Sequence, residues 1–205
     1  ECLAEQGRLE EAEERYREAI NARRAALAID ALRHGWAITV EGLRLLPAET
    51  GFGAGITAPR MLISAARAVT LKLANQREAA VPEAPVLIRG AEPFDLAMAR
   101  ALADPAQDLN YPMKGPFLAE QLDWHAAAAA AMELARLAGI LPAFLVSTGV
   151  EPAATLSADD LAAFKDPLDL TVQARARLPV AACETAEIVA FRARDDLREH
   201  VALIV

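Results

Sequence analysis

An alanine-rich segment places the strongest constraint on how this chain can fold. Residues 124–146 read WHAAAAAAMELARLAGILPAFLV. Alanine has the highest helix propensity and glycine commonly follows a helix end, so the segment predicts a helix over residues 123–138 that ends at Gly139. Asp123 is the expected N-cap residue. Because alanine side chains are small, neighbouring elements must approach this helix closely, and we expect most of it to be buried.

The chain as a whole alternates between helical and extended patterns. Residue spacing predicts helices over residues 1–34, 61–73, 94–103 and 123–138, a capped helix from Ser157, and strands over residues 36–40, 85–89 and 142–147. Residues 42–59 are rich in glycine and are expected to form a long loop. The alternation favours an α/β (α+β layered) fold with a mixed sheet flanked by helices.

The two ends of the chain have patterns of their own. Residues 1–27 are Glu-rich with apolar positions at helical spacing, which predicts a helical extension. Residues 187–194 and 200–205 alternate as strands around the turn Asp195-Asp196, which predicts a C-terminal β-hairpin. We therefore expect three units: the extension (1–27), a layered domain (28–178), and the opening strands of another domain (179–205).

Charge and cysteine content exclude several classes of partner. The chain has 21 Lys and Arg against 29 Asp and Glu, a net charge of −8, so no nucleic-acid partner is expected. No apolar run reaches the ~18 residues of a membrane span, so no membrane partner is expected either. Cys2 and Cys183 lie far apart and form no metal-binding motif. The expectation is a reduced, cytoplasmic protein.

Several segments resemble enzymes of riboflavin biosynthesis. The predicted helix at 29–35 with the following strand, and His125-Ala-Ala-Ala leading into LARLAG at 134–139, are similar to the dihydroxybutanone phosphate synthase domain. Residues 177–179, 186–191 and 199–205 resemble the first strands of GTP cyclohydrolase II, which follows a synthase domain in many bacterial chains. LISAARAVTLKLANQREAA and LADPAQDLNYPMKGPF resemble the degenerate N-terminal region of some proteobacterial GTP cyclohydrolase II proteins.

This resemblance covers residues 28–205 and relates two of the expected units to known domains. It implies that residues 28–178 are a degenerate synthase-like domain and that residues 179–205 open an incomplete cyclohydrolase II domain. Because synthases of that family are dimers, it also implies a homodimer.

The chain departs from the synthase pattern where that family places its chemistry. Active synthases follow the first strand with an acidic D-x-x-R-E-N-E loop whose carboxylates bind a divalent metal. Here residues 41–49 read EGLRLLPAE, and the Thr and Glu that follow the motif histidine are replaced by Ala126 and Ala127. The resemblance therefore implies a catalytically silent scaffold or dimerisation region.

The cyclohydrolase segment leads to a matching expectation about metal. That family binds zinc with clustered cysteines, and Cys183 is followed by no further cysteine before Val205. We expect no cofactor in this chain and a truncation before the zinc site. Zinc and GTP would bind only with a downstream domain.

Three residues are candidates for a functional site. The resemblance makes His125 a metal ligand or base, and the alternative is a vestigial residue at a helix start. Lys114 in a Gly/Pro-rich loop is a candidate phosphate ligand, or else an ordinary exposed lysine. Arg67 recurs with Lys72 and Arg77 along one predicted helix and its exit, which indicates either an anion-binding patch or a solvated face.

Two other classes of function stay open. One is an enzyme acting on a sugar phosphate, with a rearranged site around His125 and Lys114. The other is a helical adaptor built on residues 1–34. Within that segment, GRLEEAEERYREAI at 7–20 resembles the second half of a tetratricopeptide repeat, although such repeats need about three copies to bury a core.

Overall fold

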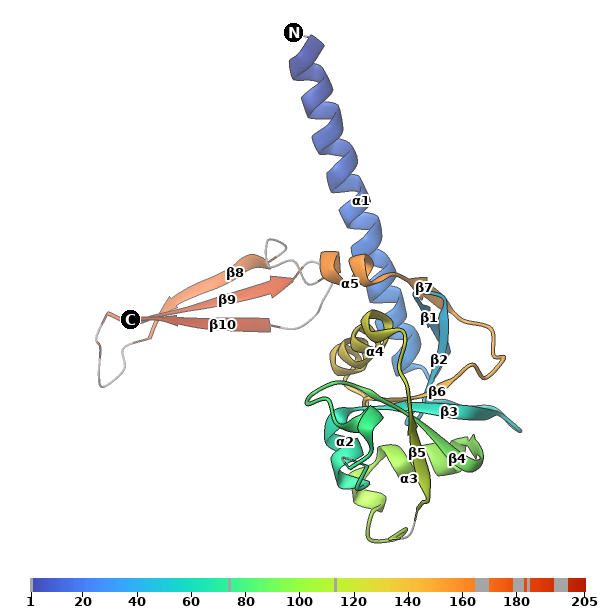
Figure 1. Ribbon diagram of the computed structural model, residues 1–205. Coiled ribbons are helices and arrows are strands. Elements are labelled where there is room, and N and C mark those ends of the chain that lie inside the picture. The colour runs from blue at the N-terminus through green and yellow to red at the C-terminus, as the bar shows by residue number, and fades with distance from the viewer. Residues whose placement is uncertain are drawn as a thin grey trace.

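The computed structural model describes residues 2–73, 75–112, 114–164, 170–178, 183, 185–193 and 199–205. They form a seven-stranded mixed sheet with helices on both faces, and a separate three-stranded antiparallel sheet (Figure 1). This arrangement confirms the predicted α/β class, with a helical N-terminal extension and C-terminal hairpin strands.

The bounds of the elements are as follows. The helices are α1 (Cys2–Arg33), α2 (Ala65–Thr70), α3 (Leu96–Ala103), α4 (His125–Ala138) and α5 (Ala158–Phe164), with short 3-10 turns η1 (Arg77–Ala79) and η2 (Pro105–Gln107). The strands are β1 (Ile38–Val40), β2 (Leu43–Pro47), β3 (Thr57–Ile63), β4 (Val86–Asp95), β5 (Phe117–Glu120), β6 (Ala143–Val146), β7 (Ala154–Leu156), β8 (Leu170–Arg177), β9 (Glu187–Ala193) and β10 (Glu199–Ile204). The large sheet has the order β5-β4-β3-β6-β2-β1-β7. Its neighbours pair antiparallel except for the parallel pair β1 and β7.

The large sheet is buried on both faces. Leu62 of β3 and Phe144 of β6 belong to a core that includes α1 and α4. Met61 of β3 and Leu145 of β6 point to the opposite side and belong to a core with α2 and α3. Successive strand residues thus alternate between two cores, which explains why these strands are continuously apolar.

The helix predicted over residues 61–73 is wrong at its beginning. Met61 and Ile63 lie in β3, and α2 begins at Ala65 after the N-cap Ser64, whose Oγ accepts a hydrogen bond from the Arg67 backbone N–H at 3.3 Å. A short apolar run fits a strand buried on both faces as well as a buried helix. Periodicity therefore could not separate the two.

The long loop predicted over residues 42–59 is also wrong, because it contains β2 and the first residues of β3. Glu41 and Gly42 connect β1 to β2, with φ of 48° and 79°. These left-handed values are those of the favoured two-residue hairpin turns. Gly42 therefore marks a tight turn.

The predicted elements β1, α3, α4, β6 and α5 are confirmed with small shifts of their ends, and the strand predicted over residues 85–89 is confirmed as β4, which continues to Asp95. Ser157 and Asp160 form the predicted capping pair of α5. The Asp160 N–H donates to Ser157 Oγ at 3.2 Å, and the Ser157 N–H donates to Asp160 Oδ2 at 2.7 Å. Strands β5 and β7 were not predicted.

The start of α4 differs from the prediction. Its N-cap residue is Trp124, which makes no side-chain capping bond, so the assignment of Asp123 is wrong. The Asp123 carboxylate accepts a hydrogen bond from Gln121 Nε2 at 2.7 Å instead. The end at Gly139 is confirmed, with the left-handed φ of 72°.

Burial along α4 follows the helical period. Ala127, Ala128 and Ala131 are at most 2% exposed, whereas Ala126 and Ala129 are exposed. Eight of the 14 residues of α4 are buried, which confirms the expected burial of most of the helix, and Ala126 and Ala129 lie on its exposed side.

The last turns of α1 belong to the core of the domain. Ala25, Ala28 and Leu32 are 0% exposed, and the helix contacts α4, α5 and β7. The N-terminal part of α1 extends beyond the rest of the molecule (Figure 1). The helical adaptor built on residues 1–34 stays a prediction. Among the described helices, α1 included, none is long and apolar enough to cross a membrane.

The C-terminal hairpin pairs with a further strand. The predicted strands are β9 and β10, paired from Glu187↔Ile204 to Arg192↔Glu199. The unpredicted β8 pairs antiparallel with β9 on its other side. The predicted hairpin is therefore confirmed as two strands of a three-stranded sheet. The predicted turn Asp195-Asp196 lies outside the described residues.

The two faces of α4 give a matched pair of variants. Ala128→Leu adds three carbon atoms at a 0% exposed position, and we expect this overpacking to lower the free energy of unfolding by about 1–3 kcal/mol. Ala129→Leu makes the same change at an exposed position one residue away and should stay within about 0.5 kcal/mol of the unmodified chain. Urea unfolding followed by circular dichroism measures both. Equal stability of the two variants would contradict the observed packing of α4.

Candidate functional site

Arg67 is buried beneath the end of α3. Its side chain is 6% exposed. Nε donates to the carbonyl oxygen of Leu102, and Nη2 lies 3.5 Å from the carbonyl oxygens of Ala101 and Asp104. Cations are favoured here because the last carbonyls of a helix lack intrahelical partners. The interpretation of Arg67 as part of a solvated face is therefore wrong.

Lys114 is also buried, with a side chain that is 5% exposed. Its Nζ donates to the carbonyl oxygen of Ala101 at 2.6 Å and to Asp108 Oδ1. The interpretation as an ordinary exposed loop lysine is wrong. The structure thus brings two of the three candidate residues, Arg67 and Lys114, to the same end of α3.

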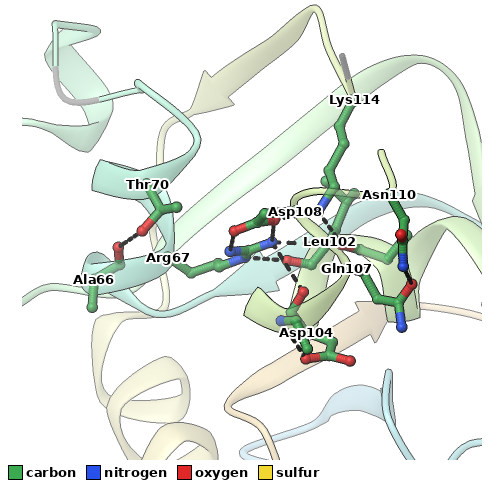
Figure 2. A network of polar contacts seen from close by, with 11 residues as sticks. Ala66, Arg67, Thr70, Leu102, Asp104, Gln107, Asp108, Asn110 and Lys114 are labelled. Atoms are coloured by element: carbon green, nitrogen blue, oxygen red, sulfur yellow. Dashed lines mark hydrogen bonds and ion pairs between the residues drawn. The ribbon is translucent and has the colours of Figure 1, made fainter. Parts of the chain in front are cut away.

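Asp108 joins these two cations (Figure 2). Arg67 donates from Nη1 to Asp108 Oδ2 at 2.6 Å and from Nη2 to Oδ1 at 2.5 Å, a bidentate pair. Lys114 shares the Oδ1 atom. The hydrogen bonds from Arg67, and then from Lys114, hold the pKa of the Asp108 carboxyl well below its usual range. We call these residues the Arg67–Asp108–Lys114 cluster.

Sequence reasoning missed Asp108. The signal lay in the requirement that buried cations be paired, since Asp108 is six residues before Lys114 in an otherwise irregular segment. Nothing in the local pattern shows that Arg67 and Lys114 are buried, because their burial depends on how α2 and α3 pack.

A cavity of about 500 Å³ opens beside the cluster. Lys114 and Asp108 line it together with residues 70–73, Gln76, residues 111–112 and residues 115–117. Lys72, an expected neighbour of Arg67, is exposed at this cavity, whereas Arg77 is exposed and does not line it. Of the candidate anion-binding residues, Lys72 and Lys114 therefore lie at one cavity, and Arg77 does not.

His125 lies apart from this cluster. It is exposed at the first position of α4 and does not line the cavity beside Lys114. Its side chain makes no hydrogen bond or ion pair with any other part of the chain that the structure describes. A rearranged site that uses both His125 and Lys114 is therefore not assembled here.

The carboxylates that follow β1 bind backbone groups. Glu41 Oε1 accepts a hydrogen bond from the Ala158 N–H at the start of α5, at 2.7 Å. Glu49 Oε2 accepts one from the Leu141 N–H, just before β6, at 2.6 Å. Each carboxylate thus fixes the entry to another element.

In the part of the chain that the structure describes, no three His, Cys, Asp or Glu side chains gather closely enough to hold a metal ion. Cys183 Sγ lies 3.3 Å from Thr185 Oγ1, and this hydrogen bond lowers the pKa of the Cys183 thiol.

Neutralising Asp108 should destabilise the fold. Asp108→Asn leaves Arg67 and Lys114, which are 6% and 5% exposed, without an anionic partner. We expect a loss of about 3 kcal/mol in the free energy of unfolding. Glu151→Gln is the control because its ion pair with Arg44 is exposed and 3.7 Å long, and it should change stability by less than about 1 kcal/mol.

The pH dependence gives an independent check of the same carboxyl. Because folding lowers the pKa of Asp108, its contribution is complete above the unfolded value of about 3.9 and is lost as the pH falls below it. Chemical unfolding at a series of pH values should show the difference between the unmodified chain and Asp108→Asn shrinking in acid. A difference that stays constant down to the acid limit would contradict the pairing.

The chain is similar to the GTP cyclohydrolase-2 of Azospirillum brasilense, with 28% identity over 186 residues. The match covers 83% of this chain and 47% of that protein, so the chain spans about half the length of this relative. No family model matches the chain, and no solved structure matches it significantly. The similarity supports the resemblance to GTP cyclohydrolase II proteins, at the level of a distant relative.

Proposed function

We propose that this chain is a catalytically silent scaffold and dimerisation region of a riboflavin-pathway GTP cyclohydrolase II protein. The observation that carries the proposal is that the carboxylates of Glu41 and Glu49 bind backbone groups. They are the carboxylates between β1 and β3 in the segment where the resembled synthases place their acidic loop. Here a two-residue turn replaces that loop, and the carboxylates bind the backbone N–H groups of Ala158 and Leu141.

The second support is the state of the motif histidine. His125 begins α4 as in the resembled synthases, but the next two residues are alanines, of which Ala126 is exposed and Ala127 is packed in the core. General acid–base catalysis needs proton-transfer groups within hydrogen-bonding reach of one another. In this proposal the chain therefore retains the synthase helix but lacks the reactive side chains that follow its histidine.

Hydrolysis of GTP would belong to the remainder of such a protein. The relative is about twice as long as the region that aligns. The resembled cyclohydrolase domain holds zinc with clustered cysteines, whereas this chain contains only Cys2 and Cys183. Zinc and GTP are thus assigned to the complete cyclohydrolase domain, which the strands within residues 179–205, β9 and β10, would begin.

Exposed apolar side chains on the small sheet support a role in assembly. Val201 and Leu203 of β10 are 62% and 51% exposed, and Val172 of β8 is 48% exposed. Within the described residues, β8 and β10 each pair on one side only, since β9 lies between them. Open edges with apolar side chains favour pairing with further chain. We assign this sheet to contacts with the rest of the protein or with a second subunit.

The isolated chain tests both parts of the proposal. With magnesium and ribulose 5-phosphate, or with zinc and GTP, it should release no formate above a blank without protein, because neither set of reactive groups is present. In sedimentation at high micromolar concentration it should form dimers. A folded sample, verified by circular dichroism, and an active synthase as positive control make both results interpretable.

Two results would contradict the proposal. Formate release that disappears in His125→Ala would assign the chain to an enzyme with its own site. A strictly monomeric chain at high micromolar concentration would remove the dimerisation role, while leaving the absence of activity as a separate finding.

A further inference from the structure

The cavity beside the Arg67–Asp108–Lys114 cluster has an unbalanced charge. The charged residues that line it are Lys72, Lys114 and Asp108, and the Asp108 carboxylate is also paired with Arg67, which does not line the cavity. Both oxygens of that carboxylate already accept hydrogen bonds from the cluster. The protein as a whole is acidic, with a net charge of −8, so the positive charge at this cavity is opposite in sign to the net charge of the chain.

Lys114 keeps donor capacity at this place. An ammonium group has three N–H donors, and the contacts to Ala101 and Asp108 use two of them. The side chain is 5% exposed, yet it lines the cavity. A buried cation with incomplete neutralisation is costly, and an anion in the cavity would reduce that cost.

Lys72 contributes from an unusual backbone position. It follows the end of α2 with φ of 60°, a left-handed conformation in which glycine is normally favoured. Its exposed side chain borders the same cavity as Lys114.

The other walls suit a small organic molecule. Thr70 and Tyr111 bring hydroxyl groups, and Leu71, Pro116 and Phe117 bring apolar surface. The volume of about 500 Å³ lies within the usual range of small-molecule sites, roughly 300–1,000 Å³. The geometry therefore combines a cationic end with an apolar wall.

We propose that this cavity binds a phosphate monoester, held by Lys114 and Lys72 through its phosphate and packed against Leu71 and Phe117 through its organic part. A phosphate monoester carries a charge of about −1.5 to −2 at neutral pH. Because Arg67 already pairs with Asp108, the charges of the two lining lysines, Lys72 and Lys114, are available to balance that of the phosphate. The inference goes beyond the scaffold role, because a silent scaffold needs no ligand at this cavity.

The test uses phenyl phosphate as the probe, with inorganic phosphate and phenol as comparisons. In calorimetric titrations at constant ionic strength, phenyl phosphate should bind more tightly than inorganic phosphate, and phenol should not bind. Chemical-shift changes in nitrogen-edited NMR spectra should concentrate at residues 70–73 and 111–117.

Lys72→Gly separates binding from stability. Glycine adopts positive φ without strain, so the melting temperature should stay the same or rise, while the affinity for phenyl phosphate falls roughly two- to fivefold through the loss of an exposed charge. Arg77→Ala is the matched control, because it removes a nearby exposed cation that does not line the cavity. Its affinity should be unchanged.

Lys114→Gln tests the buried contact and should lower the affinity roughly tenfold or more, since a charged hydrogen bond is lost. If this variant does not fold, Lys72→Gly and the shift map decide the question alone. Absence of phenyl phosphate binding, shift changes mapped elsewhere, or equal affinities in Lys72→Gly and Arg77→Ala would overturn the proposal. None of these outcomes bears on the scaffold role, which is tested separately by formate release and sedimentation.

Discussion

The close packing of α1 on α4 is the contact on which the rest of the domain depends. Both helices contribute buried alanines to one core: Ala25, Ala28 and Ala31 of α1, and Ala128, Ala131 and Ala135 of α4, all at most 3% exposed. Small side chains at a helix contact allow the two helices to approach each other closely. Arg33 at the end of α1 strengthens the contact by donating to the carbonyl oxygens of Leu137 and Ala138 at 3.2 Å each.

That contact fixes where the remaining parts of the first face can lie. The end of α1 also packs on α5 and β7, while α4 leads through Gly139 into β6 at the centre of the large sheet. On the opposite face, the Arg67–Asp108–Lys114 cluster has a comparable role. It ties α2, the end of α3 and the segment before β5 together through one carboxylate.

Sequence patterns predicted what depends on local chemistry. Gly139 and the Ser157–Asp160 pair specify helix ends, and both of these predictions are confirmed. Patterns failed where two structures share one pattern, as at Met61–Ile63, where a strand buried on both faces looks like a helix. They also failed at β8, whose pairing with β9 is a long-range contact that no local signal reports.

The candidate site likewise combines features that residue type predicts with features that depend on tertiary packing. Lys114 and Arg67 were chosen by residue type, and the structure does bring them together. Their partner Asp108 and their burial follow from tertiary packing, so no spacing rule could supply them. His125 was chosen through a resemblance, and its surroundings could not be read from its neighbours in sequence.

The central claim is that the carboxylates after β1 stabilise the fold by binding backbone N–H groups and take no part in catalysis. Replacing Glu41 and Glu49 together by alanine tests it most directly, with the free energy of unfolding and formate release measured on the same samples. The account predicts a loss of about 1 kcal/mol for each missing backbone contact and no formate release before or after the change. Unchanged stability, together with a formate-releasing activity that the double variant abolishes, would contradict it.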